Sequence, residues 1–398
     1  MSLLNREPGR RALVVSGLLV LASLVAAVVL HVRHPDALVT LLPGADMRDL
    51  HVDFDTFWHS AVALVSGADI YDTPAKLTNL NPPLLTVLLV PFAWLDALTA
   101  YRVFAVFTLL LVVASVLAVA REVRLSRTAT ALALLAVLAS SPLHGTLVLG
   151  QIYPLLLTGL VAGWIAERRG RPVLAAVLYG VTVALKPSLA PVLLLLAVQR
   201  RWAPLRAGVA AAAVATIAGA LVAGPSSAIE WLKIAFTEPV PDTVDNASLP
   251  GLAVRFGVPS VVGTLAGLVV LVGTLVWIGR RRDRIDPAGT APWAVLAAGL
   301  LFSPIAWHNY LLLLFPGALA LVPLGLGALT AAGLALAVIP VSWNAEWPPD
   351  NTLADVARSL YCLILVGYWA VLLSSSVRSA RSSAAAGAPA PVSSSVPD

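Results

Sequence analysis

Long apolar segments alternate with short polar connections along most of the chain. Apolar windows long enough to cross the ~30 Å hydrocarbon core of a bilayer recur from Leu13 to Leu373. The first of them, Leu13–Val32, is longer than a signal-peptide core and lacks a small-residue cleavage site, so it predicts a retained helix. The pattern predicts an all-α polytopic membrane protein.

Composition agrees with this prediction and narrows the chemistry. The 398 residues are 59% hydrophobic and 12% charged, with a mean hydropathy of +0.88, whereas a soluble domain carries roughly 25% charged residues. The single cysteine, Cys362, excludes an intrachain disulfide and a Cys-rich metal site. The chain has no Walker loop, no GxGxxG after a strand and no HExxH. Soluble nucleotide chemistry and a nucleic-acid partner are therefore not expected.

Arginine clusters assign the connections to two sides of the membrane. Connections rich in Arg face the cytoplasm under the positive-inside rule. The remaining connections, which carry most of the carboxylates, then face outward: 33–81, 224–258, Ser303–Asn309 and 344–352. The basic clusters are Arg6/Arg10/Arg11, Arg121/Arg124/Arg127, Arg168/Arg169/Arg171, Arg200/Arg201/Arg206, Arg280/Arg281/Arg282/Arg284 and Arg378/Arg381.

We expect one membrane-embedded domain over residues 1–373, with about 10–12 transmembrane helices and both termini inside. Its two large extracytoplasmic loops are 33–81, which holds interfacial helices, and 224–258. Residues 374–398, rich in Ser, Ala and Pro, predict a disordered cytoplasmic tail.

Two stretches depart from simple crossings. Lys186-Pro187 interrupts the short interval between Arg171 and Arg200, which predicts two short helices meeting near the outer face, or a re-entrant pair. Between Pro82 and Ala120 the length allows two crossings, whereas the charges on either side require an odd number.

The first outer loop contains an unusual concentration of carboxylates. The stretch HVDFDTFWHSAVALVSGADIYD, residues 51–72, carries four of the 21 acidic residues. After Asp53 the apolar positions follow helical spacing up to Gly67, a suitable C-terminal stop, which predicts an amphipathic helix along the outer interface. Asp53 precedes or opens this helix. An N-cap is one role for its carboxylate and a positioned general base is another, and the two are compatible.

Two further stretches place basic groups at the same face. Lys186 lies between apolar segments, where a lysine either snorkels to the headgroups or has a partner or a function. His308 follows a Ser-Pro break between two spans, with Trp307 and Tyr310 beside it. It is either a residue of the aromatic belt or part of a site.

The second outer loop adds polar residues that belong either to a hydrated connector or to the same site. The stretch EPVPDTVDNASLPGLAVRFG contains Asp245, Asn246 and Arg255. An acid, a lysine, a histidine and an arginine are thus all expected at one membrane face. A transporter would more naturally place its ionisable groups near the bilayer midplane.

Four segments, in order, resemble glycosyltransferase family 87. DFDTFWHSAVALVSGADIYD followed by NLNPPLLTVLLVPFAWL is similar to the family's first-loop pattern, ALKPSLAPVLLLLAVQRRW to its L-K-P segment, DNASLPGLAVRFG to its N-x-S block, and SPIAWHNYLLLLFP to its S-P-x-x-W segment. The family contains actinobacterial mannosyl- and arabinofuranosyltransferases of the GT-C superfamily that use polyprenyl-phosphate sugars. The sequence departs from the pattern at Asn79–Pro83, where Leu80-Asn81 stands in place of an aromatic residue.

The resemblance implies a GT-C-like bundle whose outer loops surround the site, with a catalytic acid that matches Asp53. Loss of a lipid phosphate from the sugar develops negative charge, which cations stabilise. Lys186, His308 and Arg255 are therefore the expected phosphate-binding residues. Further expected substrate contacts are Asp55, which falls on a variable motif position, Trp58, Tyr71, Asn81, Asn246 and Trp307.

The expected activity is inverting transfer of mannose from a polyprenyl phosphate to a cell-envelope glycolipid or polysaccharide, on the outer side of the plasma membrane. An arabinofuranosyltransferase and a non-enzymatic lipid-linked sugar transporter or flippase are the alternatives. No cofactor and no metal site are predicted. Bound membrane lipid is expected.

Overall fold

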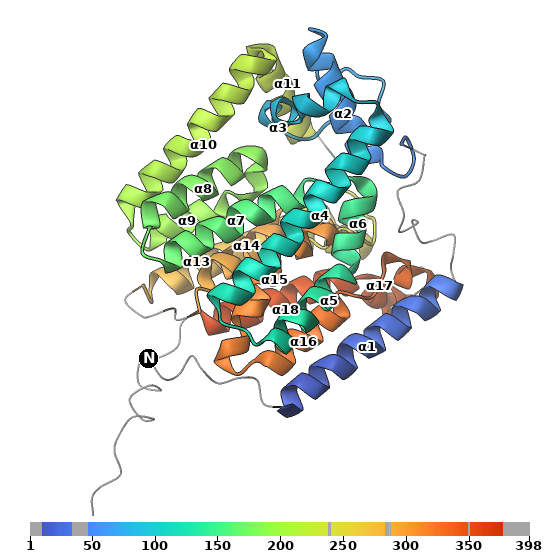
Figure 1. Ribbon diagram of the computed structural model, residues 1–398, viewed down its shortest axis with the longest axis vertical. Helices are drawn as coiled ribbons and strands as arrows, with labels where there is room; N and C mark the ends of the chain where they lie inside the picture. The colour runs from blue at the N-terminus through green and yellow to red at the C-terminus, as the bar shows by residue number, and fades with distance from the viewer. Residues whose placement is uncertain are drawn as a thin grey trace, which may run out of the picture.

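The protein is an all-helical bundle in the computed structural model (Figure 1). The structure describes residues 10–33, 47–237, 240–282, 286, 288–348 and 351–376. Within these ranges there is no strand, and the one antiparallel bridge joins Asn246 to Trp307. The all-α prediction is confirmed. Residues 34–46 of the first expected loop and 377–398 of the expected tail lie outside the described residues.

The α-helices differ widely in length, and short 3₁₀ segments (η) separate several of them. In chain order they are α1 (Arg10–Arg33), α2 (Val52–Val65), α3 (Pro83–Leu89), η2 (Val90–Trp94), α4 (Ala97–Glu122), α5 (Arg127–Leu138), α6 (Ser141–Leu149), α7 (Tyr153–Arg168), α8 (Pro172–Leu185), η3 (Pro187–Leu189), α9 (Pro191–Val198), α10 (Trp202–Ala223), α11 (Pro225–Thr237), α12 (Leu249–Arg255), α13 (Ser260–Gly279), α14 (Ala291–Phe302), η4 (His308–Leu314), α15 (Phe315–Ala320), η5 (Val322–Leu324), α16 (Gly327–Leu336), η6 (Val341–Glu346), α17 (Thr352–Arg358) and α18 (Leu360–Ser375).

Three of the described helices, α4, α10 and α13, are long and apolar enough to cross a membrane. The pairs α5 with α6 and α17 with α18, bent by 50° and 61°, raise the number to five if each pair is one span. The other apolar helices are shorter, so helix length alone does not fix the number of crossings. The expected 10–12 crossings therefore stay a prediction.

Large apolar side chains remain exposed in helical stripes on the outer faces of the long helices. Such surface would promote aggregation in water but suits contact with lipid tails. The stripes include Val103, Val106 and Leu110 on α4, Val214, Ile217 and Leu221 on α10, and Val261, Leu265 and Val269 on α13.

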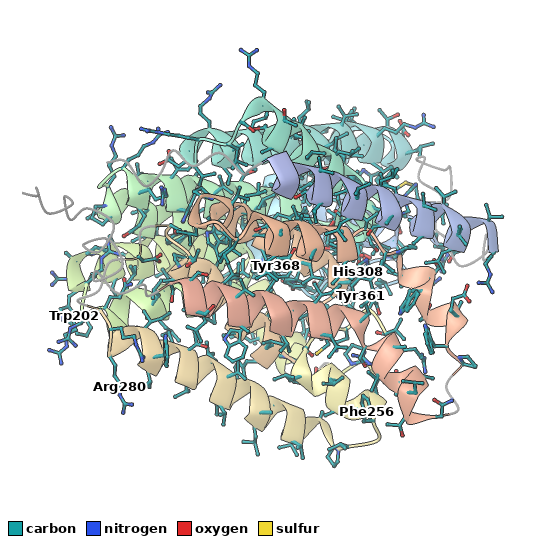
Figure 2. All side chains as sticks on the ribbon, turned by 90° about the horizontal axis from the view of Figure 1, so that it is seen from below. Trp202, Phe256, Arg280, His308, Tyr361 and Tyr368 are labelled. Atoms are coloured by element: carbon teal, nitrogen blue, oxygen red, sulfur yellow. The ribbon has the colours of Figure 1, made fainter. Side chains whose placement is uncertain are left out.

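The described arginine clusters gather at one end of the bundle. Glu122 at the end of α4 forms ion pairs with Arg168 and Arg169 at the end of α7, at 3.5 and 3.0 Å. Glu167 likewise pairs with Arg201 at the start of α10. Figure 2 shows Trp202 and Arg280 at this end and Phe256 toward the other. These clusters therefore lie near one another in the structure, and the side of the membrane that they face stays a prediction.

The interval from Pro82 to Ala120 contains one long helix. The 7-residue α3 and the 5-residue η2 pack against α2, and only the 26-residue α4 is long enough to cross. One crossing satisfies the odd number that the flanking charges require. In Figure 1, α2, α3 and α11 lie together at the end of the bundle away from α5 and α16.

The chain breaks at Lys186, as predicted. Its backbone is extended, with φ −147° and ψ 90°, between α8 and η3. Pro187 disfavours the helical conformation for the residue before it, which explains why α8 ends here. The 14 residues of α8 rise about 21 Å at 1.5 Å per residue, less than a ~30 Å hydrocarbon core. The short α8 and α9 fit either expected alternative, two short helices that meet near the outer face or a re-entrant pair.

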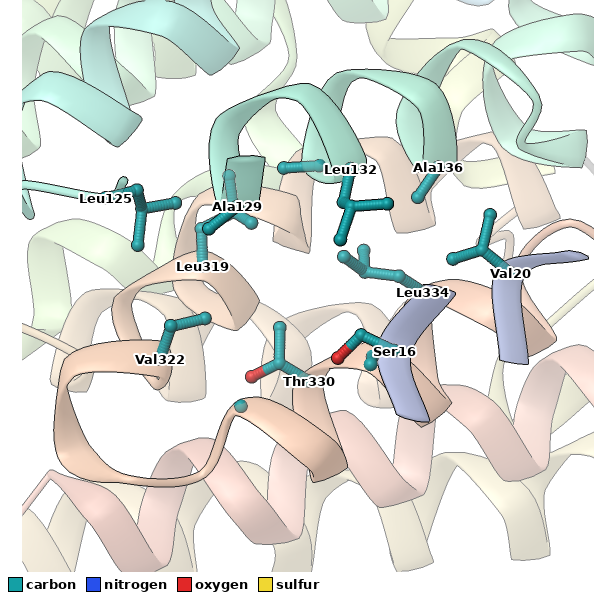
Figure 3. A pocket seen from close by; sticks show the side chains of 13 residues that line it. Ser16, Val20, Leu125, Ala129, Leu132, Ala136, Leu319, Val322, Thr330 and Leu334 are labelled. Carbon is teal, nitrogen blue, oxygen red and sulfur yellow. The ribbon is translucent and has the colours of Figure 1, made fainter. Parts of the chain in front are cut away.

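An apolar pocket lies between α1, α5 and α16 (Figure 3). Ser16 and Thr330 contribute its hydroxyl groups, and Val20, Leu132 and Leu334 are among its apolar walls. None of the expected site residues lines this pocket.

The two-sided topology predicts a labelling pattern. In a Cys362→Ser background, which removes the buried native thiol, single cysteines replace the exposed Ser66, Ser226 and Thr128. We expect Ser66→Cys and Ser226→Cys to react with an impermeant maleimide in intact cells, and Thr128→Cys to react only after permeabilisation, because it lies in the arginine-rich end. Labelling of Thr128→Cys in intact cells would reverse the assignment of sides.

Candidate active site

Asp53 lies in the first turn of α2 and faces the protein interior. The helix begins at Val52, its N-cap is His51, and no side chain caps it. The N-cap role considered for Asp53 is therefore wrong. Its Oδ2 instead accepts a hydrogen bond of 2.8 Å from Nε2 of Gln151, a residue distant in the sequence. The carboxyl group is thus held by tertiary contact and turned toward the interior, while the residue as a whole is half-buried.

The turn between α6 and α7 brings Gln151 to Asp53. Gly150 adopts φ +73°, in the left-handed region that favours glycine, and an added Cβ would lie 2.4 Å from Cβ of Phe54. A larger residue would thus force the turn away from α2. His51 Nδ1 also donates to the carbonyl of Val148, at 2.6 Å, which fixes the start of α2 to the end of α6.

The electrostatic setting suits Asp53 as a base. Burial of the carboxyl group raises the pKa of Asp53 to about 6. The hydrogen bond from Gln151 and the positive charge of Lys186 lower this pKa, whereas the negative charge of Asp245 raises it. A carboxylate with this pKa is ionised at neutral pH and is a stronger base than an exposed aspartate.

Lys186 points into the protein. Its Nζ donates to Oδ1 of Asn81, at 3.1 Å, and lies 5.9 Å from the ring centroid of Tyr310. Nζ is held by these contacts and does not extend freely toward headgroups. The Leu80-Asn81 departure from the family pattern therefore supplies the amide that orients the lysine. Tyr71 supports the same segment, because its hydroxyl donates to the carbonyl of Asn81, at 2.8 Å.

An aromatic pair connects Lys186 to the interior of the bundle. The rings of Tyr153 and Tyr310 lie 4.5 Å apart between centroids, inclined at 50°. Both residues are buried, with 1% and 3% of their surface exposed. Tyr153 begins α7 directly after Gln151 and Ile152, so the turn that positions the amide also positions this ring.

His308 lies buried beneath the second outer loop. Its backbone N–H donates to the carbonyl of Asp245, at 2.7 Å, and its ring packs 5.0 Å from that of Tyr361 (Figure 2). Neither ring nitrogen has a hydrogen-bond partner among the described residues. An added Cβ on Gly145 would lie 2.9 Å from Nε2, so that nitrogen faces α6 closely. Burial favours the neutral imidazole, which can still donate one hydrogen bond.

Arg255 and Asn246 hold the second outer loop in place. The guanidinium of Arg255 donates to Oγ of Ser359 and to the carbonyls of Thr243 and Asn246, at 3.1, 2.6 and 3.0 Å. All three of its nitrogens are thus engaged within the protein. The fully buried Asn246 side chain bonds to backbone groups on both sides of the loop, and its backbone pairs with Trp307.

The remaining expected contacts on α2 lie away from the Asp53 carboxylate. Asp55 is buried, and its Oδ1 lies 3.6 Å from Nε2 of His59. The indole N–H of Trp58 is shared between the carbonyls of Phe92 and Leu95, each at 3.2 Å. These residues attach α2 to neighbouring structure. The structure brings together Asp53, Lys186 and Asn81, with the Asp245 backbone linked to His308.

Sequence reasoning missed Gln151 and the aromatic partner Tyr153. A search for ionisable residues passes over a neutral amide, although Gln151 is a polar residue in the otherwise apolar stretch that precedes α7. The adjacent Gly150 and Pro154 were a further signal, because they punctuate the apolar run.

Within the described part of the chain, no group of three or more His, Cys, Asp and Glu side chains lies close enough to hold a metal ion. The site contains two carboxylates, Asp53 and Asp245, and one lysine. This donor set fits a polar organic substrate with one phosphate group, because carboxylates accept from hydroxyls and an ammonium pairs with phosphate.

Comparison with known proteins supplies the reaction class. The sequence model of glycosyltransferase family 87 matches residues 79–304. The chain is 28% identical over 348 residues to a polyprenol-phosphate-mannose-dependent alpha-(1-2)-phosphatidylinositol mannoside mannosyltransferase of Mycolicibacterium smegmatis, covering 76% of this chain and 77% of the relative. It is 29% identical over 310 residues to an alpha-(1->3)-arabinofuranosyltransferase of Mycobacterium tuberculosis, covering 73% and 69%.

The chain also aligns with a solved structure of low sequence identity. ArnT from Cupriavidus metallidurans bound to undecaprenyl phosphate aligns over 89% of this chain and 76% of its own, with a TM-score of 0.45 and 17% identity.

Proposed function

Because the chain belongs to glycosyltransferase family 87, we propose that this membrane glycosyltransferase moves mannose from a polyprenyl phosphate to a hydroxyl of a cell-envelope glycolipid or polysaccharide. The observation that carries the proposal is the Asp53 carboxylate, hydrogen-bonded to Gln151 and within electrostatic range of Lys186. A base and a cation that interact electrostatically are what transfer from a phosphate ester to an alcohol requires.

The proposed reaction is a single displacement. Asp53 takes the proton of the acceptor hydroxyl as its oxygen bonds to C1 of the sugar from the face opposite the phosphate. The C1–O bond to the phosphate breaks, and polyprenyl phosphate leaves with its charge changed from about −1 toward −2. Lys186 stabilises this developing charge, and an N–H of His308 is the second candidate donor. Inversion at C1 follows from one displacement.

Arg255 has a structural role in this proposal and does not bind the donor phosphate. Since its nitrogens already donate to Ser359, Thr243 and Asn246, the guanidinium orders the loop that carries Asp245 and His308. Asn81 acts by orienting Lys186. The further candidates Tyr71, Asn246 and Trp307 support these residues through backbone contacts.

Mannose is proposed as the sugar because two mannosyltransferases that use polyprenol-phosphate-mannose are among the relatives with the highest coverage. Arabinofuranose is the second candidate, supported by the arabinofuranosyltransferases at similar identity. A polyprenyl donor fits a site at the outer interface, because the lipid tail stays in the bilayer while the sugar reaches the loops. The site then faces the extracytoplasmic side of the plasma membrane.

The test is release of polyprenyl phosphate by detergent-purified protein. A short-chain polyprenyl-phosphate mannose, labelled in the sugar, is incubated with a phosphatidylinositol mannoside acceptor, and the arabinofuranose donor is run in parallel. We expect mannose in the lipid acceptor and one free polyprenyl phosphate for each sugar transferred. Transport of intact donor across proteoliposomes without release of polyprenyl phosphate would favour a transporter or flippase and refute the proposal.

A further inference from the structure

The backbone around Asp245 is held rigidly at the edge of the site. The Asp245 carbonyl accepts from the N–H of His308, at 2.7 Å. Arg255 donates to the carbonyls of Thr243 and Asn246, which flank Asp245. The Asn246 side chain, 0% exposed, bonds to the carbonyls of Pro241 and Pro304 and to the N–H groups of Ser248 and Ala306. A loop held by this many contacts presents the Asp245 side chain in one place.

The Asp245 side chain, unlike its backbone, is not held in place by the described residues. It is half-buried, and no residue that the structure describes gives it a hydrogen bond or an ion pair. Its oxygens are not shut off from solvent, so they are free to accept hydrogen bonds from the hydroxyl groups of a bound ligand. Its negative charge acts on the site, because it raises the pKa of Asp53.

From this geometry we infer that Asp245 is a sugar-binding residue, whose carboxylate accepts hydrogen bonds from hydroxyl groups of the transferred sugar. The inference rests on the proposed function and identifies the sugar as the part of the substrate that this residue binds. Neutral hydroxyls suit the position, because a second anion would be repelled by Asp53 and Asp245 together. A sugar ring between the two carboxylates gives each a different hydroxyl to bind.

The donor sugar fits Asp245 better than the acceptor does. Asp245 is joined through His308 to the segment that carries Tyr310, and the Tyr310 ring faces Lys186, the proposed phosphate-binding residue. The transferred sugar is bonded to that phosphate through C1, so its hydroxyls lie within a few bonds of it. The acceptor hydroxyl must instead approach Asp53 from the opposite face of C1.

The experiment pairs variants with altered donors. Detergent-purified parent, Asp245→Ala, Asp245→Asn and Asp242→Asn are assayed with the short-chain donor and with donors in which each sugar hydroxyl in turn is replaced by hydrogen. Asp242 is the matched control, because it lies in the same loop and is exposed. Binding of polyprenyl phosphate alone, which lacks the sugar, checks that each variant is folded and retains its phosphate site.

We expect Asp245→Ala to lower kcat/KM with the natural donor by about 10- to 100-fold, the usual effect of losing a hydrogen bond to a charged group. With the parent, one deoxy donor should have a kcat/KM lower than that of the natural donor by a similar factor. With Asp245→Ala, the same deoxy donor and the natural donor should have almost equal kcat/KM. Asp245→Asn keeps one acceptor oxygen, so its kcat/KM with the natural donor should lie between those of the parent and Asp245→Ala. Binding of polyprenyl phosphate should not change, and Asp242→Asn should match the parent.

Two results would overturn the inference. If every deoxy donor lowers kcat/KM by the same factor in Asp245→Ala as in the parent, Asp245 does not contact the donor sugar. If the coupling appears only with deoxy acceptors, the residue binds the acceptor and the assignment is wrong. Failure of the parent itself to use any polyprenyl-phosphate sugar is a separate outcome, which refutes the proposed function and this inference with it.

Discussion

Asp53→Asn is expected to lower transfer by about 10²- to 10⁴-fold, the usual contribution of a general base. The amide keeps an oxygen that can accept the hydrogen bond from Gln151 but cannot take a proton at neutral pH. Folding should not suffer. Burial raises the pKa of the Asp53 carboxyl group to about 6, so the free energy of unfolding falls as the pH rises from about 4 to about 6 and stays lower above that; the neutral amide removes this cost.

Single-turnover transfer from a short-chain polyprenyl-phosphate sugar, normalised to folded protein, is the measurement. Asp55→Asn is the control on the same helix, because Asp55 is paired with His59 away from the Asp53 carboxylate. It should retain most of the activity. Equal damage from both substitutions, or more than about a tenth of the parental activity in Asp53→Asn, would contradict the assignment of Asp53 as the base.

The same residue predicts a pH profile for the parent enzyme. Since the base must be ionised, kcat/KM should fall as the pH drops through about 6, the pKa of Asp53, and level off above it. Gln151→Leu removes a hydrogen bond that lowers this pKa and should therefore move the acid limb to higher pH. A limb that stays near pH 4 in both proteins would show that another group controls it.

The architecture could be predicted because it depends on properties spread over many residues. Twenty or so apolar residues in each window require helices, since lipid offers no partner for backbone groups. The arginine clusters are expected on one side of the membrane. In the structure, Arg168, Arg169 and Arg201 lie at one end of the bundle, where they form ion pairs with acidic residues of neighbouring helices. The single long helix after Pro82 followed from charge and not from length.

The details of the site could not be predicted, because they depend on which helices meet. Nothing in the sequence near Asp53 indicates Gln151, which reaches it only because Gly150 allows a close turn against Phe54. Arg255 was predicted from its charge alone, whereas its partners are backbone carbonyls that sequence patterns do not show. The sequence predicts Asp53, Lys186, His308 and Arg255 at one face, and packing decides what each of them contacts.

Lys186→Met tests whether the lysine stabilises the departing phosphate. Met keeps most of the apolar stem and removes the charge. A preorganised group of this kind contributes ~2–4 kcal/mol to the transition state, so single-turnover rates should fall roughly 30- to 1000-fold. The loss should appear mainly in kcat, because the interaction strengthens as the second negative charge develops. Lys233→Met is the control, since Lys233 is exposed on α11 and paired with Glu230.

The measurement must be made at pH 8 or above. The positive charge of Lys186 lowers the pKa of Asp53, so its removal also leaves more of the base protonated near neutral pH. At high pH the base is ionised in both proteins. The remaining difference in rate then reports the lost stabilisation of the departing phosphate. The acid limb of the Lys186→Met profile should itself move upward, which is an independent sign that the ammonium lies beside Asp53.

Lys186→Arg separates phosphate binding from snorkelling to the lipid headgroups. A lysine that binds the departing phosphate through Nζ, held by Asn81 and Tyr310, is replaced poorly by a guanidinium, whose donors form a wider, fixed fork. Arg should then restore only part of the rate. A snorkelling lysine gives the opposite pattern, in which Arg substitutes fully and Met costs little. A single-turnover rate for Lys186→Met within roughly threefold of the parent rate at high pH would be well short of the loss expected for a stabilising group. Lys186 would then have no part in stabilising the leaving group, and His308 would have to do so alone.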